Sequence, residues 1–170
     1  MTTWPTATDP SDEKCLADVR QYGWHVVKIL ETGDTPQWCF TVGLHRSFGH
    51  PEIITFGLPL DTGHAVLNIA GSAAKSGRRF TTGTPYDDFL DGYPCELRTV
   101  DPVWYRWFVG YAMWFYGGEP FPLLQLFWPD RHGTFPWAAA PDHWLRSEQP
   151  LLYEADEVAA GAGPLLDTLR

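Results

Sequence analysis

The sequence is poor in cysteine and has no long apolar run. Cys15, Cys39 and Cys95 lie far apart in the chain and form no CxxC pair, so a disulfide framework is not indicated and we expect buried free thiols. No apolar stretch reaches the roughly 18 residues that a transmembrane helix requires. The N-terminus lacks the basic and apolar regions of a signal peptide. We therefore expect a cytoplasmic domain with no membrane contact.

Charged residues are also scarce, at 19% of the chain, and basic ones are outnumbered. Twelve Lys and Arg against 21 Asp and Glu give a net charge of −9. Such an acidic protein repels phosphate backbones, so no nucleic-acid partner is expected. The sequence contains no Walker loop, GxGxxG or GxSxG motif, which disfavours P-loop NTPases and α/β-hydrolases.

Aromatic residues, in contrast, are abundant. They make up 15% of the 170 residues and include nine Trp, within a hydrophobic fraction of 44%. This length and composition suit one domain with a substantial core. We expect that domain over residues 9–153. Residues 1–8 are polar and residues 154–170 are rich in Ala, Gly and acidic residues, so both termini are predicted to be flexible.

Capping signals predict helices in the parts of the chain that have helical spacing of apolar residues. Asp9-Pro10 and Asp101-Pro102 each place a capping carboxylate before a proline, which is tolerated in the first turn. Gly23 and Gly77 are typical helix ends. The three expected helices cover residues 10–22, 61–76 and 102–116.

Runs of β-branched and aromatic residues between turn signals predict strands. They cover residues 24–30, 37–44, 52–58, 95–100 and 123–127. Consecutive strands without strict βαβ alternation favour an α+β fold over a Rossmann-type sheet. We expect an antiparallel or mixed sheet of about five strands, with three helices packed mainly on one face.

An ordered series of short motifs resembles a known family. These motifs are FTVGL at 40–44, GHPEI at 49–53, FGL at 56–58, QLFWPD at 125–130, FPW at 135–137 and QPLL at 149–152. Over roughly residues 13–152 the chain is similar to the bacterial DUF4262 family. The resemblance implies a single domain. Because the family is named for its unknown function, it implies no catalytic residue and no cofactor.

The richest polar cluster is the segment between the second and third predicted strands, with His45, Arg46, His50 and Glu52. Two imidazoles and a carboxylate could form a three-ligand zinc site, but the spacing matches no established metal motif, and we assign no metal ligand. His50 and Glu52 could alternatively act as acid and base. In a structural role, His50 would bond to the backbone and Glu52 would pair with Arg46.

Two further polar groups follow predicted elements. Asp130 and His132 lie in a Pro/Gly-rich turn after the last strand, where Asp130 can form an Asx turn or the two can stand at a pocket mouth. Lys75, Arg78 and Arg79 follow the second helix. They either complement the helix dipole or bind a carboxylate or phosphate.

The segment 102–116 carries aromatic residues around most of its circumference. A helix of this kind is either covered on two sides or exposes an apolar patch, and Tyr and Trp are favoured at interfaces. The candidate interface residues are Tyr105, Tyr111, Trp114 and Tyr116.

The leading functional hypothesis is a binding domain for a protein partner or a small molecule, which could form a homodimer through the aromatic helix. The alternative is a hydrolase-like or metal-assisted enzyme that uses His45, His50 and Glu52 with Asp130 and His132. The enzyme hypothesis requires these five side chains to converge on one concave pocket.

Overall fold

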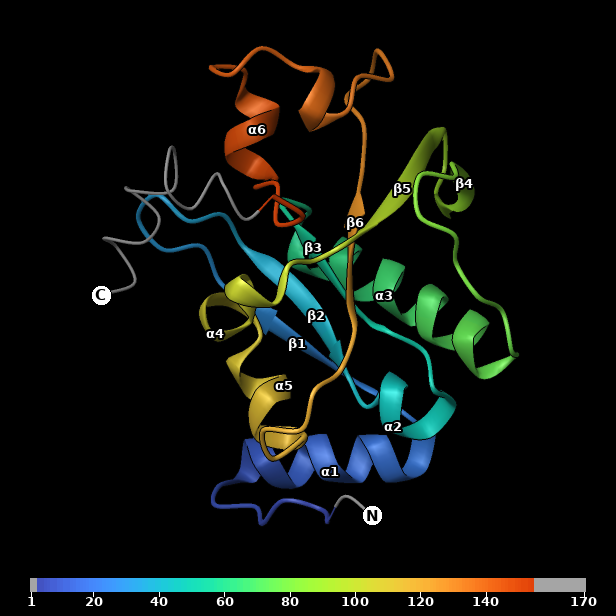
Figure 1. The fold of residues 1–170 in the computed structure, drawn as a ribbon, viewed down its shortest axis with the longest axis vertical. Helices are drawn as coiled ribbons and strands as arrows, with labels where there is room; N and C mark the ends of the chain where they lie inside the picture. Colours follow the sequence, from blue (N-terminus) through green and yellow to red (C-terminus); the bar gives the residue numbers. More distant parts are fainter. Residues whose placement is uncertain (1–2, 155–170) are drawn as a thin grey trace.

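The protein forms a mixed β-sheet with helices on both sides (Figure 1). The structure, a computed structural model, describes residues 3–154. Apart from Glu154, the C-terminal segment predicted to be flexible lies outside the described residues. Within them, one six-stranded sheet has the order β1-β2-β3-β6-β5-β4. The strands are β1 His25–Ile29, β2 Trp38–Val42, β3 Glu52–Phe56, β4 Tyr86–Leu90, β5 Tyr93–Thr99 and β6 Leu123–Phe127.

One neighbouring pair of strands in the sheet runs in the same direction. β3 and β6 are parallel, with Glu52 opposite Leu123, and every other neighbouring pair is antiparallel. The carboxyl ends of β3 and β6 therefore lie at the same edge of the sheet. The α+β class and the mixed sheet are confirmed, and β4 is a strand that the sequence did not predict.

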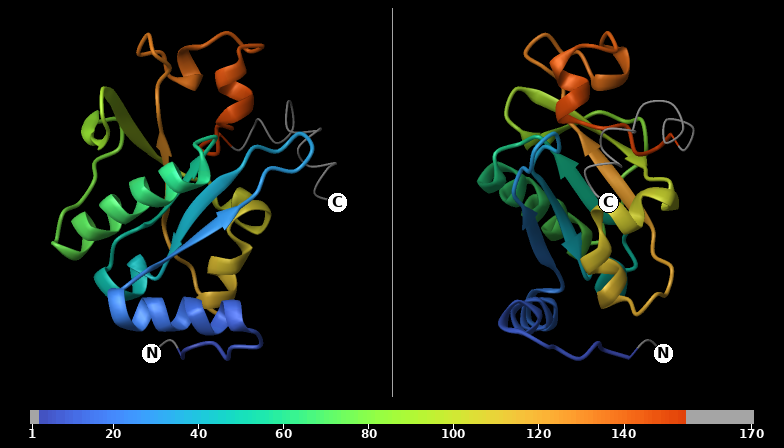
Figure 2. Two further views of the ribbon diagram at one scale, coloured as in Figure 1. Left: turned by 180° about the vertical axis from the view of Figure 1, so that it is seen from behind. Right: turned by 90° about the vertical axis from the view of Figure 1, so that its left-hand side faces the viewer.

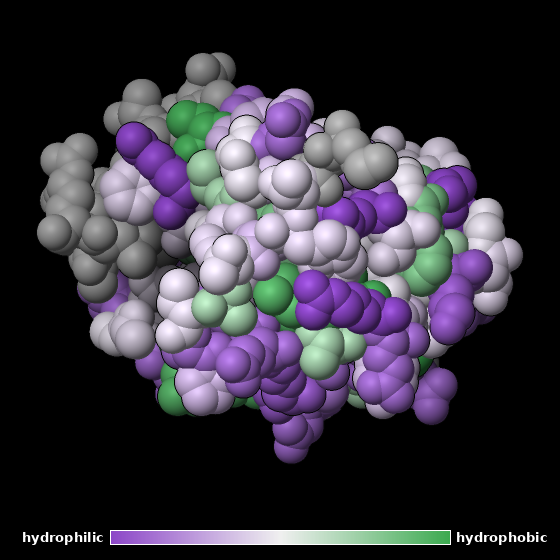
Figure 3. Space-filling model, turned by 90° about the horizontal axis from the view of Figure 1, so that it is seen from below, coloured by the Kyte–Doolittle hydropathy of each residue, from purple (hydrophilic) through white to green (hydrophobic). Residues whose placement is uncertain are grey.

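The described residues contain eight helical elements, five of which overlap the three predicted helical segments. They are α1 Pro10–Tyr22, α2 Leu44–Phe48, α3 Leu60–Lys75, the 3-10 turn Pro102–Trp104, α4 Tyr105–Phe108, α5 Gly110–Phe115, the 3-10 turn Pro136–Ala138 and α6 Trp144–Glu148. The Asp9 side chain accepts a hydrogen bond from Asp12 N, and Gly23 ends α1 with a φ of 102°. On the underside of the molecule, where α1 lies, hydrophilic residues leave only small hydrophobic areas exposed (Figure 3).

Helices cover both faces of the sheet rather than mainly one, because the central strands are apolar on both sides. Every residue of β2, β3 and β6 is buried. One core packs α1, α4 and α5 around Phe40 and Phe56, and the other packs α3 around Ile53 and Leu97. Two views of the ribbon show α3 on one side of the sheet and α4 and α5 on the other (Figure 2).

The aromatic segment predicted as one helix over 102–116 is helical but divided. The break falls at Val109, whose φ and ψ of −129° and 35° are not helical. Next to the break, the Trp38 indole donates a hydrogen bond of 3.0 Å to the Phe108 carbonyl oxygen. Packing against the sheet thus fixes the segment's geometry at the point where the helix is interrupted.

Two more features differ from the sequence prediction. α2 lies in the segment 45–51 that was expected to be a loop, and α6 lies in the turn-rich region after Pro129. Near the N-terminus, the Trp4 ring packs edge-on against Phe115, with centroids 5.6 Å apart, so this part of the predicted flexible segment contacts the core. Within residues 3–154 we find no helix that is both long and apolar enough to span a bilayer.

Candidate functional site

Glu52, the first residue of β3, has no exposed surface and lies at the centre of a hydrogen-bond network. Its carboxyl oxygens accept hydrogen bonds from Thr41 Oγ1 at 2.6 Å, from Gly43 N at 2.7 Å and from His45 N at 3.3 Å. The Tyr116 hydroxyl donates a further, short hydrogen bond. Glu52 thereby joins β2, the start of α2 and the end of α5.

Every group around the Glu52 carboxyl is a donor. The Thr41 hydroxyl accepts from Ile53 N at 2.9 Å and the Tyr116 hydroxyl accepts from Arg46 N at 3.3 Å, so both hydroxyl protons are directed at the carboxyl group. Burial raises the pKa of Glu52, and these hydrogen bonds oppose the rise. A carboxyl group so enclosed holds structure together and is not presented to a ligand.

His50 faces the other core. Its ring is fully buried, its Nδ1 donates to the Pro51 carbonyl oxygen at 2.7 Å, and it contacts the Phe80 ring edge-on at 5.4 Å between centroids. Phe80 packs on the α3 side, whereas Glu52 shares the face of β3 that carries Ile54 and Phe56. His50 and Glu52 are therefore on opposite sides of the sheet and cannot act as one acid–base pair.

His45 and Arg46 also lie in structural contacts. The His45 ring packs edge-on against Tyr116, with centroids 5.9 Å apart, and the Arg46 guanidinium lies 4.2 Å from the centroid of the Trp4 ring. Among residues 3–154, no three His, Cys, Asp or Glu side chains are close enough to hold a metal ion. The zinc interpretation of this segment therefore has no ligand set in the described chain.

Asp130 and His132 lie at the opposite end of the sheet. Glu52 is opposite Leu123 at the start of β6, and Asp130 follows seven residues later. At about 3.3 Å per residue this separation is roughly 20 Å. The five side chains of the enzyme hypothesis thus do not converge on one pocket.

Asp130 and His132 do line a pocket of their own, with a volume of about 670 Å³. It lies at the carboxyl ends of β3 and β6 and is closed on one side by α6. The lining residues are Leu58, Leu90, Tyr93, Trp128, Pro129, Asp130, Arg131, His132, His143 and Trp144. We call this cavity the Trp128 pocket, after the indole at its base.

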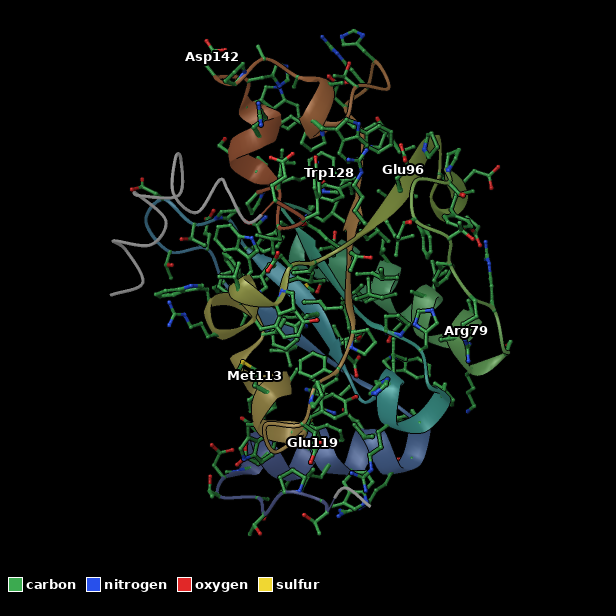
Figure 4. All side chains as sticks on the ribbon, viewed as in Figure 1. Arg79, Glu96, Met113, Glu119, Trp128 and Asp142 are labelled. Carbon is green, nitrogen blue, oxygen red and sulfur yellow. The ribbon has the colours of Figure 1, made fainter. Side chains whose placement is uncertain are left out.

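The base of the pocket is fixed by close packing between strand ends and α6. The Trp128 indole donates to the Phe56 carbonyl oxygen at 2.8 Å and lies 6.1 Å from the Trp144 ring, centroid to centroid. Figure 4 shows Trp128 beside the end of β6. Gly57, at a φ of 80°, leaves no room for a side chain, because a Cβ there would stand 2.8 Å from the Glu148 carbonyl oxygen and 3.1 Å from Trp128.

The mouth of the pocket is polar. Asp130 Oδ1 accepts from His132 N at 2.8 Å and from Thr134 N at 2.9 Å, which is the predicted Asx turn, and these bonds lower the pKa of Asp130. His143 Nδ1 accepts from Leu145 N at 3.2 Å, so the proton of the neutral ring lies on Nε2. Arg131 and His132 are exposed beside them.

The ring residues of the pocket were missed at the level of sequence. Tyr93 and Trp144 are 42% and 53% exposed, which is unusual for such large side chains. Their signal was weak because Tyr93 stands in a turn cluster and Trp144 in a region without periodicity. Two Trp in otherwise polar, turn-rich segments are the feature that could have indicated an aromatic site.

The candidate interface residues are more buried than expected for side chains that would contact a partner. Tyr116 is only 3% exposed and bonds to Glu52, so it belongs to the core and not to an interface. Tyr105 and Tyr111 are partly buried and donate their hydroxyls inward, to the Phe121 carbonyl oxygen at 2.8 Å and to Asp12 at 2.6 Å. Trp114 is partly buried against Tyr111.

Comparison with known families matches residues 18–142 to the family described as Domain of unknown function (DUF4262). The chain belongs to this family. The match confirms the resemblance carried by the ordered motifs. In this DUF4262 domain the matched segment includes the whole sheet and the turn at Asp130, and it ends just before His143 and Trp144. No curated protein and no solved structure matches the chain.

Proposed function

We propose that this DUF4262 domain binds a small, flat and mainly apolar ligand in the Trp128 pocket. The observation that carries the proposal is a cavity of about 670 Å³ lined by the rings of Tyr93, Trp128 and Trp144. Ligand pockets usually have volumes of about 300–1,000 Å³, with apolar and aromatic walls and a few polar groups. In sheets with parallel strands, ligands commonly bind at the carboxyl ends, which is where this pocket lies.

The polar side chains at the pocket mouth are better suited to orienting a ligand than to catalysing a reaction. Asp130 Oδ1 is occupied by two backbone N–H groups, and His143 Nδ1 caps α6. The hydrogen-bond donors among the lining groups include the Arg131 guanidinium and the ring N–H of His143. Such donors would bond to an oxygen at one end of a ligand whose ring stacks on the indoles.

The expected location of this function is the bacterial cytoplasm. All three cysteines are free and buried, which is compatible with a reducing compartment. Burial raises the pKa of Cys39 to about 11, and those of Cys15 and Cys95 to about 12, so these thiols support no nucleophilic role.

The test uses three small aromatic probes that share a ring and differ in charge: indole, indole-3-acetate and tryptamine. Each is titrated to millimolar concentration into ¹⁵N-labelled protein. We expect chemical-shift changes confined to the Trp128 and Trp144 indoles and to backbone amides near Asp130. Indole-3-acetate should bind more tightly than tryptamine, because Arg131 and His143 present donors.

Two variants make the test specific. Trp144→Ala should abolish the shifts, whereas Leu30→Ala, which removes another highly exposed apolar side chain that does not line this pocket, should leave them unchanged. Absence of shifts with all three probes, or shifts that persist in Trp144→Ala, would refute the proposal.

A further inference from the structure

A second groove runs along the opposite edge of the sheet, away from the Trp128 pocket. β1 is the terminal strand of the sheet order, and no strand of residues 3–154 pairs with its outer side. A groove of about 770 Å³ follows this edge. Seen from behind, β1 stands at the rim of the sheet between α3 and α1 (left view of Figure 2).

The two walls of the groove are rows of side chains at helical spacing. Ser11, Lys14, Asp18 and Tyr22 line it from α1, and His64, Asn68 and Ser72 line it from α3. Residues three or four apart on a helix lie one above the other, so each helix presents a continuous row. Residues 25–28 of β1, together with Trp24 and Tyr111, form the rest of the lining.

Close packing fixes the α3 wall against the beginning of β1. A Cβ at Gly71 would stand 2.4 Å from the Trp24 indole, so only glycine allows this approach. The same indole donates to Asn68 Oδ1 at 3.0 Å. The groove is therefore preformed, which lowers the entropic cost of filling it.

The groove carries a small net positive charge, because two lysines and one carboxylate line it, in a protein whose net charge is −9. Its one carboxylate, Asp18, accepts from Lys14 Nζ at 3.0 Å and from His25 Nδ1 at 2.7 Å, and is thereby neutralised. Lys28 is exposed at the edge and forms no ion pair within residues 3–154. His64 adds an imidazole, but burial lowers its pKa, so the ring is mainly neutral near pH 7 and adds little charge.

We propose that this groove binds an extended acidic segment of another protein, which adds to the sheet as a strand beside β1. An edge strand leaves alternate N–H and C=O groups unpaired, and these provide the main-chain hydrogen bonds of strand addition. Side chains of the added strand would alternate between the α1 row and the α3 row. Acidic side chains there would meet Lys28, because Lys14 is already paired with Asp18.

A second copy of this chain is a poorer occupant. Pairing of two β1 strands about a twofold axis would bring two positive grooves together, and like charges across paired strands are destabilising. A lysine such as Lys28 on an edge strand also disfavours pairing between identical edges. The acidic segment is therefore the complementary partner.

The test selects phage-displayed random decapeptides against the purified full-length protein. We expect enrichment of peptides that alternate Asp or Glu with β-branched residues. A selected peptide should shift the amides of residues 25–29 in ¹⁵N-labelled protein and slow their hydrogen exchange. Methylation of alternate peptide nitrogens should abolish binding, because strand addition requires those N–H groups.

Charge variants separate this groove from the rest of the surface. Lys28→Glu should weaken the selected peptide about tenfold or more, because it places like charges together. Lys75→Glu makes the same charge change on α3 outside the groove and should have little effect. Trp144→Ala should leave this binding unchanged, so failure here is distinguishable from failure of the Trp128 pocket.

Four outcomes would overturn the proposal. They are no enrichment, enrichment of basic or apolar peptides, shifts confined to residues that do not line the groove, and protection of β1 through concentration-dependent dimerisation without peptide.

Discussion

Gln149 pairs with Trp128 as a neighbouring strand would. Trp128 N donates to Gln149 Oε1 at 3.0 Å, and Gln149 Nε2 donates to the Trp128 carbonyl oxygen at 2.8 Å. The Gln149 side chain is fully buried. Because Trp128 lies just beyond the end of β6, its backbone has no paired strand there, and one side-chain amide satisfies both groups. Gln125 bonds in the same way to Pro150 and Leu152.

The first prediction concerns this amide. Gln149→Ala leaves a buried N–H and a buried C=O at Trp128 without partners, at about 1–3 kcal/mol for each group. We expect the free energy of unfolding in urea to fall by roughly 2–6 kcal/mol. Gln21→Ala, at an exposed position on α1, serves as the control and should change little. A Gln149→Ala protein as stable as the wild type would show that the amide pairing contributes nothing.

The second prediction concerns the glycine beneath α6. Gly57→Ala introduces a side chain at a positive φ and within 2.8 Å of the Glu148 carbonyl oxygen. Gly83→Ala has a similar φ of 77° but nothing within 4 Å, so it isolates the conformational cost, which is about 1–2 kcal/mol. We expect Gly57→Ala to be clearly less stable than Gly83→Ala and to weaken probe binding in the Trp128 pocket. Equal melting temperatures for the two variants would contradict the close packing.

The sheet was largely predictable from sequence because its central strands are apolar on both faces. All five predicted strands exist, whereas β4 was missed because its exposed Asp87 and Asp88 are typical of turns and not of strands. The short helix α2 was missed for a different reason. It is a single turn between Gly43 and Gly49 with no side-chain cap, so local sequence carries almost no signal for it.

The sites were less predictable because they depend on long-range geometry. His50 and Glu52 are two residues apart, which in a strand would place both on one face. The strand begins only at Glu52, however, so the alternation does not extend to His50. The Trp128 pocket joins a strand end to α6 across 16 residues of irregular chain, from Trp128 to Trp144. No local pattern specifies that contact.

The third prediction concerns the buried carboxyl at the start of β3. Glu52→Leu leaves the Thr41 hydroxyl, two backbone N–H groups and the Tyr116 hydroxyl without an acceptor. We expect it to cost more than about 4 kcal/mol of unfolding free energy, while Glu52→Gln keeps the Oε1 bonds and costs about 1–3 kcal/mol. Glu31→Gln, at an exposed position, is the control.

The same carboxyl has a defined pH dependence. Because burial raises the pKa of Glu52, its protonated form contributes stability that is fully present below the unfolded value near 4.5 and is lost as pH rises through the folded pKa. Glu52→Gln should lack this loss. Denaturation curves of both proteins from pH 4 to pH 8 measure the difference, and parallel pH profiles would argue against the raised pKa.

The last prediction concerns His50, for which burial lowers the pKa. Unfolded His50 takes up a proton near pH 6.5, while the buried ring, packed against Phe80, resists it. Stability is therefore unaffected well above pH 6.5 and declines as pH falls from there toward the folded pKa, by at most about 1.4 kcal/mol per pH unit for one proton. His50→Phe cannot titrate, so its stability should decline less steeply between pH 7 and pH 5.

Burial also lowers the pKa of His64. His64 therefore contributes to the same decline of stability with falling pH and provides a second histidine for comparison. We expect His50→Phe and His64→Gln each to flatten the slope, and the double variant to flatten it most. Glu52 changes stability with pH in the opposite direction, but it is present in both proteins. Its effect therefore cancels when the unfolding free energy of the variant is subtracted from that of the wild type. Urea denaturation at half-unit pH steps measures these slopes. If His50→Phe retained the full wild-type slope, the buried imidazole would have to titrate as it does in the unfolded chain.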